Sequence, residues 1–128
     1  MKPFKLALSV AALIAGLSSA FAASRVAYEA KGFEAVLETG KPVLVHVTAP
    51  WCGECKAQKP IVAALAGQPE YRDLTIVDVD FDTQKDALRR LGVQTQSTLM
   101  VFKGKTEVAR AVGITRRDAI EELFKKGL

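Results

Sequence analysis

The chain has 128 residues, of which 49% are hydrophobic and 25% are charged, and this length suits one domain rather than two. Its formal net charge of +4 comes from 18 basic and 14 acidic residues that are spread along the sequence. Such a small and scattered charge excludes a typical nucleic-acid-binding surface, and we expect no nucleic-acid partner.

The first residues have the pattern of a secretory signal peptide. Two lysines precede an uncharged and mostly apolar segment, and small residues at Ala20 and Ala22 suit cleavage by a signal peptidase. The apolar segment is shorter than the about 20 residues of a membrane-spanning helix, although an uncleaved N-terminal anchor remains an alternative. We therefore expect residues 1–22 to be a cleaved signal peptide and residues 23–128 to form one periplasmic or secreted domain.

The rest of the sequence alternates helical and extended patterns. Apolar residues at a spacing of three to four predict helices, and short β-branched runs predict buried strands. Helices are expected over Tyr28–Glu38, Trp51–Ala66, Asp82–Leu91 and from Thr115 onward. Strands are expected over Val43–Val47, Leu74–Val79, Thr98–Phe102 and Glu107–Val112. This order predicts an α/β fold in which a central mixed sheet is flanked by helices.

Capping residues set the expected ends of two of these helices. Asp82 or Thr83 is expected to cap the helix that Gly92 ends. Thr115 is expected to cap the last helix, with Asp118 three residues later as its partner in a capping box.

Cys52 and Cys55 are the two cysteines of the chain, and they follow a predicted buried strand directly. Their spacing puts both thiols in the first turn of a helix. Unpaired N–H groups and the helix dipole favour an anion there, which lowers the pKa of a thiol and populates the nucleophilic thiolate. We therefore expect Cys52 to be an exposed nucleophile and Cys55 to be the more buried thiol that resolves a mixed disulfide.

Other functions of this cysteine pair stay open. A structural zinc site needs about four ligands, whereas this chain offers two cysteines and one histidine. The alternative function is the binding of a soft metal such as Cu(I) between Cys52 and Cys55, because thiolates suit that ion. A purely structural disulfide is less favoured, because so short a loop stabilises a fold weakly. A chaperone-like domain that binds unfolded chains is a further alternative.

Several motifs together resemble the thioredoxin family. The segment Ala49-Pro50-Trp51-Cys52-Gly53-Glu54-Cys55-Lys56 resembles its active site, and Pro60 matches its helix-kinking proline. The segments Leu91-Gly92-Val93, Ser97-Thr98-Leu99 and Phe102-Lys103-Gly104 resemble its second signature, and Gly113 matches a glycine near the site.

The resemblance implies a thioredoxin-like three-layer sandwich and an exported thiol-disulfide oxidoreductase, whose expected function is the reduction of protein disulfides. Its expected partners are protein thiols and disulfides and a membrane thiol electron donor, and it is expected to be a monomer without a cofactor or metal. The resemblance assigns substrate binding to Trp51, Gln96, Ser97 and Gly113.

Two departures from the family concern Ser97 and His46. Ser97 stands where the family has a cis-proline, and the cost of a cis bond before a non-proline residue predicts a trans Gln96–Ser97 bond. Its hydroxyl is then a candidate donor to the Cys52 thiolate, or it is a tolerated loop residue. His46 replaces a buried aspartate, and it is a candidate catalytic base for Cys55 or else a satisfied core histidine. The family's lysine neighbour of that aspartate corresponds, by the resemblance, to Ile76.

The third departure is Glu54, which replaces a proline between the cysteines. A carboxylate about one turn from Cys52 opposes its thiolate by an energy on the order of 1 kcal/mol near the surface. Because a less stable thiolate makes the protein less oxidising, Glu54 favours the reducing direction. The alternative is a solvated acid that suits the start of the helix.

Overall fold

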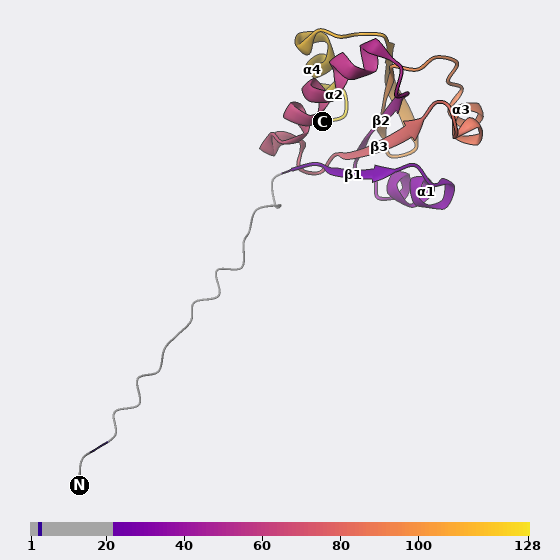
Figure 1. Cartoon of the computed structure of the whole chain (residues 1–128). Helices are drawn as coiled ribbons and strands as arrows, with labels where there is room; N and C mark the ends of the chain where they lie inside the picture. The colour runs from indigo at the N-terminus through magenta and orange to yellow at the C-terminus, as the bar shows by residue number, and fades with distance from the viewer. Residues whose placement is uncertain (1–2, 4–21) are drawn as a thin grey trace.

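A five-stranded mixed sheet forms the centre of the computed structural model, which describes residue 3 and residues 22–128 (Figure 1). The strand order is β1-β3-β2-β4-β5. Strands β1 and β2 run parallel to β3, whereas β4 runs antiparallel to both β2 and β5. The strand bounds are β1 (Ser24–Ala27), β2 (Pro42–Thr48), β3 (Thr75–Asp80), β4 (Thr98–Lys103) and β5 (Thr106–Val112).

Helices cover both faces of the sheet, so the predicted three-layer arrangement is confirmed (Figure 1). Residues of α1 and α3 pack on one face, and residues of α2 and α4 pack on the other. The helix bounds are α1 (Ala30–Glu38), α2 (Gly53–Ala66), α3 (Lys85–Leu91) and α4 (Arg117–Lys125), with a short 3-10 helix over Pro69–Tyr71.

Strand β2 is the central element, and it positions the site. Its residues from Val43 to Val47 are all fully buried. Because successive side chains of a strand point to opposite faces, Val43, Val45 and Val47 pack with α1 and α3, whereas Leu44 packs with α2 and α4. His46 shares the face of Leu44 and therefore points towards α2, which follows β2 in the sequence.

The main differences from the sequence prediction are strand β1 and the starts of helices α3 and α4. Strand β1 was not predicted, because all four of its side chains are exposed and show no buried alternation. Helix α3 begins after Asp82, because the Asp80 carboxylate accepts hydrogen bonds from the N–H groups of Asp82 and Thr83 and holds them in a turn.

The predicted cap of the last helix is also wrong. Helix α4 begins at Arg117, and its N-cap position is Arg116, which makes no side-chain cap. The carboxylate of Asp118 pairs with the Arg116 guanidinium instead of closing a capping box with Thr115. Charge pairing at the helix start therefore replaces the expected hydroxyl cap.

The predicted signal peptide, residues 1–22, lies almost entirely outside the described residues and stays a prediction. Among the residues that the structure does describe, no helix is both long enough and apolar enough to cross a membrane.

Candidate active site

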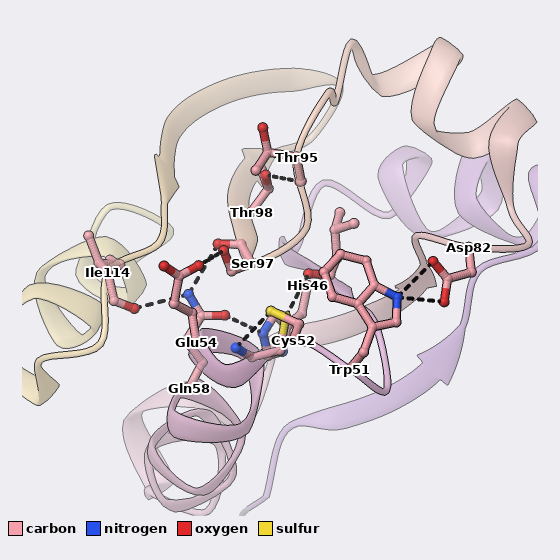
Figure 2. Close-up of a disulfide and its surroundings, with 12 residues drawn as sticks. His46, Trp51, Cys52, Glu54, Gln58, Asp82, Thr95, Ser97, Thr98 and Ile114 are labelled. Carbon is pink, nitrogen blue, oxygen red and sulfur yellow. Dashed lines mark hydrogen bonds between the residues drawn. A yellow bond between two sulfur atoms is a disulfide. The ribbon is translucent and has the colours of Figure 1, made fainter.

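Cys52 and Cys55 form a disulfide at the start of α2, with their Cα atoms 5.2 Å apart (Figure 2). Cys52 is the N-cap residue of the helix, and its sulfur accepts a hydrogen bond of 3.1 Å from the Cys55 backbone N–H. That N–H is one of the donors that a helix start leaves without a partner, so it is available to a thiolate as well. The predicted position of both cysteines is confirmed.

The predicted exposure of Cys52 is wrong for this disulfide form. The exposed fraction of Cys52 is 2% and that of Cys55 is 0%. Both side chains pack against Ala49, and Phe81 lies partly buried against the same cluster. Apolar side chains therefore cover most of both cysteines. A thiol that reacts with the disulfide must come close to the small part of Cys52 that stays exposed.

Trp51 is the large exposed side chain beside the disulfide, with an exposed fraction of 59%. Its indole N–H donates to the two oxygens of Asp82, at 3.1 Å and 3.0 Å. The indole also packs edge-on against Phe81, with ring centroids 6.4 Å apart. The ring is therefore held in one orientation while most of its apolar surface stays open, as a binding platform requires.

Ser97 does not donate to the cysteine sulfur, which corrects one of the expectations for this residue. Its hydroxyl donates to a carboxylate oxygen of Glu54 at 2.9 Å (Figure 2). An ionised carboxylate is a stronger acceptor than a disulfide sulfur, which explains the choice. The Gln96–Ser97 peptide bond is trans as expected, because no cis bond occurs in residues 22–128.

The backbone of Ser97 lies in the left-handed region, with φ at 56°. It is the one residue other than glycine with positive φ in the described part of the chain. Such a conformation costs about 1–2 kcal/mol in an L-residue, so the surrounding contacts must hold it. The Ser97 carbonyl accepts a hydrogen bond of 3.0 Å from the Gly113 N–H.

Gly113 and Gln96 complete the predicted substrate surface. Gly113 has φ at 72°, and a Cβ atom there would lie 3.8 Å from the Glu54 carboxylate. Gln96 is half-buried next to Ser97. The structure thus brings Glu54, Ser97 and Gly113 together at the start of α2, and Trp51 lies beside the cysteines on the same helix start.

His46 is fully buried on β2 and contacts α2 through a hydrogen bond of 3.0 Å between its Nε2 and Gln58 Oε1. Its other ring nitrogen, Nδ1, is buried without a hydrogen-bond partner in the described residues. The next residue of β2, Val47, has its carbonyl oxygen 4.0 Å from the Cys55 sulfur. His46 is therefore not a fully satisfied core histidine, and it lies next to the residue that reaches Cys55.

Burial is the main cause that lowers the pKa of His46 below its ordinary value. The hydrogen bond to Gln58 and the negative charge of Asp78 raise the pKa, whereas the positive charges of Arg25 and Lys59 lower it. Burial is the largest of these effects, and the pKa is lowered overall. His46 is thus neutral at neutral pH, as a proton acceptor must be before it acts.

The charged neighbour of His46 on β3 is Asp78, which corrects the assignment to Ile76. The register pairs His46 with Asp78 and places Ile76 beside Leu44. Asp78 in turn accepts two hydrogen bonds from Arg25 on β1, at 2.6 Å and 2.7 Å. The ion pair of Asp78 and Arg25 therefore lies beside His46 in the sheet, and Arg25 belongs to β1, the strand that the sequence analysis did not predict.

Gln58 is the site residue that sequence reasoning missed. It is fully buried in α2, and its amide joins His46, the Ser97 carbonyl and the Ile114 carbonyl (Figure 2). A signal was available, because Gln58 lies three residues after Cys55 on the stripe that also contains Val62 and Leu65. A polar residue on a buried stripe needs partners.

The metal alternative gains no support from the described residues. Within them, no group of three or more histidine, cysteine or acidic side chains is placed to hold a metal ion.

Comparisons with known proteins agree with this geometry. The family model described as Thioredoxin matches residues 24–126. A thioredoxin of Chlamydia muridarum is 38% identical over 84 residues, which cover 66% of this chain and 80% of that protein. The protein disulfide-isomerase tigA of Aspergillus niger is 40% identical over 95 residues, 72% of this chain but only 26% of that protein. The crystal structure of Trxlp from Edwardsiella tarda has a TM-score of 0.77 at 40% identity, and the match covers 79% of this chain and 98% of that one.

Proposed function

The chain belongs to the thioredoxin family, and from this premise we propose that it is an exported protein-disulfide reductase. Membership of the family and the Cys52–Cys55 disulfide make it a thiol-disulfide oxidoreductase. The direction of the reaction, the export and the roles of the other site residues are the proposal.

The placement of Glu54 is the observation that supports a reaction in the reducing direction. Its carboxylate lies in the first turn of α2, two residues after Cys52, and it takes the Ser97 hydroxyl as its hydrogen-bond donor. A thiolate at Cys52 therefore meets a nearby negative charge and loses one candidate donor. Both effects destabilise the reduced, ionised form relative to the disulfide, which makes the reduced protein a better reductant.

The reaction then runs in two exchange steps. The Cys52 thiolate attacks a substrate disulfide, which forms a Cys52–substrate disulfide and releases one substrate thiolate that takes up a proton. The Cys55 thiol gives its proton to His46, and the resulting thiolate attacks the Cys52 sulfur. This step forms the Cys52–Cys55 disulfide and releases the second substrate thiolate, which takes up a proton, so two electrons pass from the protein to the substrate.

Trp51 and the loop at Gln96 and Ser97 are proposed to hold the substrate chain. Trp51 offers an open aromatic surface, and Gly113 leaves room where a side chain would approach Glu54. A membrane thiol electron donor is proposed to reduce the Cys52–Cys55 disulfide after each turnover. The signal-peptide pattern of residues 1–22 supports a periplasmic or secreted location.

Trapping the mixed disulfide tests this function. Cys55→Ser removes the resolving thiol, so it should accumulate a covalent complex with a reducible protein such as insulin. Cys52→Ser, the matched control, keeps one thiol in the same loop and should form no such complex. If the wild-type protein reduces insulin no faster than Cys52→Ser, the proposed reductase function is wrong.

A second measurement tests the role of His46. His46→Phe should slow the release step by about 10²-fold at neutral pH, because general base catalysis supplies about 10²–10⁴-fold. The rate of mixed-disulfide formation by Cys52 should stay the same. Equal slowing of both steps would remove His46 from the mechanism.

A further inference from the structure

The Gln58 amide has each of its polar groups in a defined hydrogen bond. Its Nε2 donates to the Ser97 carbonyl at 3.1 Å and to the Ile114 carbonyl at 2.9 Å, and its Oε1 lies 3.0 Å from His46 Nε2. Gln58 is fully buried, so water does not replace these partners. A buried amide that lost one of them would keep an unsatisfied polar group, which destabilises the folded protein.

These partners determine which way the amide points. A backbone carbonyl oxygen only accepts hydrogen bonds, so the group that faces Ser97 and Ile114 must be the amide NH2. The group that faces His46 is therefore the amide oxygen, which also only accepts. The opposite orientation would place one oxygen against two carbonyl oxygens, and it is excluded by the same chemistry.

The protonation of His46 follows from the orientation of the amide. An acceptor at Gln58 Oε1 requires a hydrogen on His46 Nε2. A neutral imidazole carries one ring hydrogen, so His46 Nδ1 holds a free lone pair. This Nδ1 is buried without a partner among the described residues. An unpartnered buried acceptor is uncommon and calls for an explanation.

The Gln58 amide also hydrogen-bonds the two segments that are proposed to bind the substrate, at Ser97 and Ile114. Ser97 lies in a left-handed backbone conformation that needs support from its surroundings. Its carbonyl receives two hydrogen bonds, one from Gln58 and one from the Gly113 N–H. Ile114 follows Gly113, so Gln58 links both segments of the proposed docking surface to the helix that carries the cysteines.

We propose that Gln58 is a positioning residue that holds His46 in the proton-accepting Nε2–H tautomer and the Ser97 loop in its docking conformation. This inference deepens the proposed function and rests on it. The proton of Cys55 passes to His46 Nδ1 in the release step, and Gln58 takes no proton itself. One side chain thereby couples the resolving chemistry to the surface that binds the substrate.

The tautomer is measured directly by nitrogen NMR of the whole protein. His46 is the only histidine of the chain, so its two ring nitrogens give one unambiguous set of signals. We expect a protonated Nε2 and a bare Nδ1 at neutral pH in the wild-type protein. In Gln58→Met, which keeps the side-chain length but offers no amide, the ring should lose this preference. An Nδ1–H ring in the wild type, or an unchanged ring in Gln58→Met, would overturn the proposal.

Kinetics separate positioning from a merely structural role. Gln58→Met should slow the release step by about tenfold, a part of the about 10²–10⁴-fold that a general base supplies. The attack of Cys52 at saturating substrate, measured in a Cys55→Ser background, should change by less than about twofold, well below the effect on the catalysed proton transfer. The substrate concentration that gives half the maximal attack rate should rise, because the Ser97 carbonyl loses one of its two hydrogen bonds. Gln94→Met, at an exposed position, is the matched control and should behave as the wild type. Equal slowing of both steps would reduce Gln58 to a structural residue.

A double variant distinguishes failure of this inference from failure of the proposed function. If Gln58 acts on release through His46, then adding Gln58→Met to His46→Phe should not slow release further. Equal slowing by Gln58→Met with and without His46 would overturn the coupling. If His46→Phe releases substrate at the wild-type rate, the base assigned to His46 is wrong, and the NMR result alone then decides whether Gln58 sets the tautomer.

Discussion

The stability of this protein should fall on mild acidification because of His46. The residue is fully buried, and burial lowers the pKa of its imidazole in the folded state below the ordinary value of 6.5. The unfolded chain has the ordinary pKa, so it binds a proton at a pH where the folded protein does not. The stabilising contribution is therefore complete above about pH 6.5 and is lost as the pH falls towards the folded pKa.

The size of the effect follows from proton linkage. Between the two pKa values the unfolded state holds up to one more proton than the folded state, so the free energy of unfolding falls by at most about 1.4 kcal/mol per pH unit. The charges that face His46 are Asp78, Arg25 and Lys59. Histidine is the side-chain type that ordinarily titrates in this window, so the slope is assigned to His46.

Urea unfolding of the oxidised protein measures this slope. The free energy of unfolding is determined at several values between about pH 7.5 and pH 5.5, where carboxylates are still largely ionised. His46→Phe is the control, because it removes the only histidine, so its free energy of unfolding should lack the slope that His46 causes. Identical slopes for the two proteins would refute the reasoning that His46 is buried in the neutral form.

Three further substitutions test other parts of the structure. Glu54→Gln should raise the reduction potential by about 20 mV, because a repulsion on the order of 1 kcal/mol is removed; an unchanged potential in glutathione buffers would contradict the role of Glu54. Arg25→Met should lower the free energy of unfolding in urea by about 0.5 kcal/mol, since its ion pair with Asp78 is partly exposed. The same variant should raise the pKa of His46 in an NMR titration, because the charge of Arg25 lowers it; a lower pKa in the variant would contradict this charge arrangement. Tyr71→Phe should raise the free energy of unfolding by about 1 kcal/mol, because the buried Tyr71 hydroxyl has no partner in the described residues; a clear loss in urea unfolding would show a hidden partner.

The fold was predictable because its strongest signals are local. The run from Val43 to Val47 is rich in β-branched residues and fully buried, and it forms the middle of β2. Gly92 was expected to end a helix, and it lies at the end of α3 in the left-handed conformation. Strand β1 escaped prediction because its pairing with β3 comes from backbone hydrogen bonds and an ion pair rather than from buried side chains.

The cysteine pair was predictable from spacing alone, but its surroundings were not. Gln58 contacts residues that lie 12, 39 and 56 positions away in the sequence, so its place on a buried stripe signals a polar contact but the fold is needed to identify the partners. The partner of the Ser97 hydroxyl was misjudged because Glu54 is 43 positions away and competes for it. The neighbour of His46 was misjudged because strand register decides between Ile76 and Asp78.

The reduction potential of the domain tests the central claim most directly. Trp51 is the only tryptophan and lies beside the disulfide, so its fluorescence reports the state of Cys52 and Cys55 in graded glutathione buffers. The proposed reductase predicts a reversible two-electron transition near the thioredoxin level of about −270 mV. A midpoint near about −120 mV would reverse the proposed direction, and the absence of any reversible transition would contradict thiol-disulfide exchange at this site.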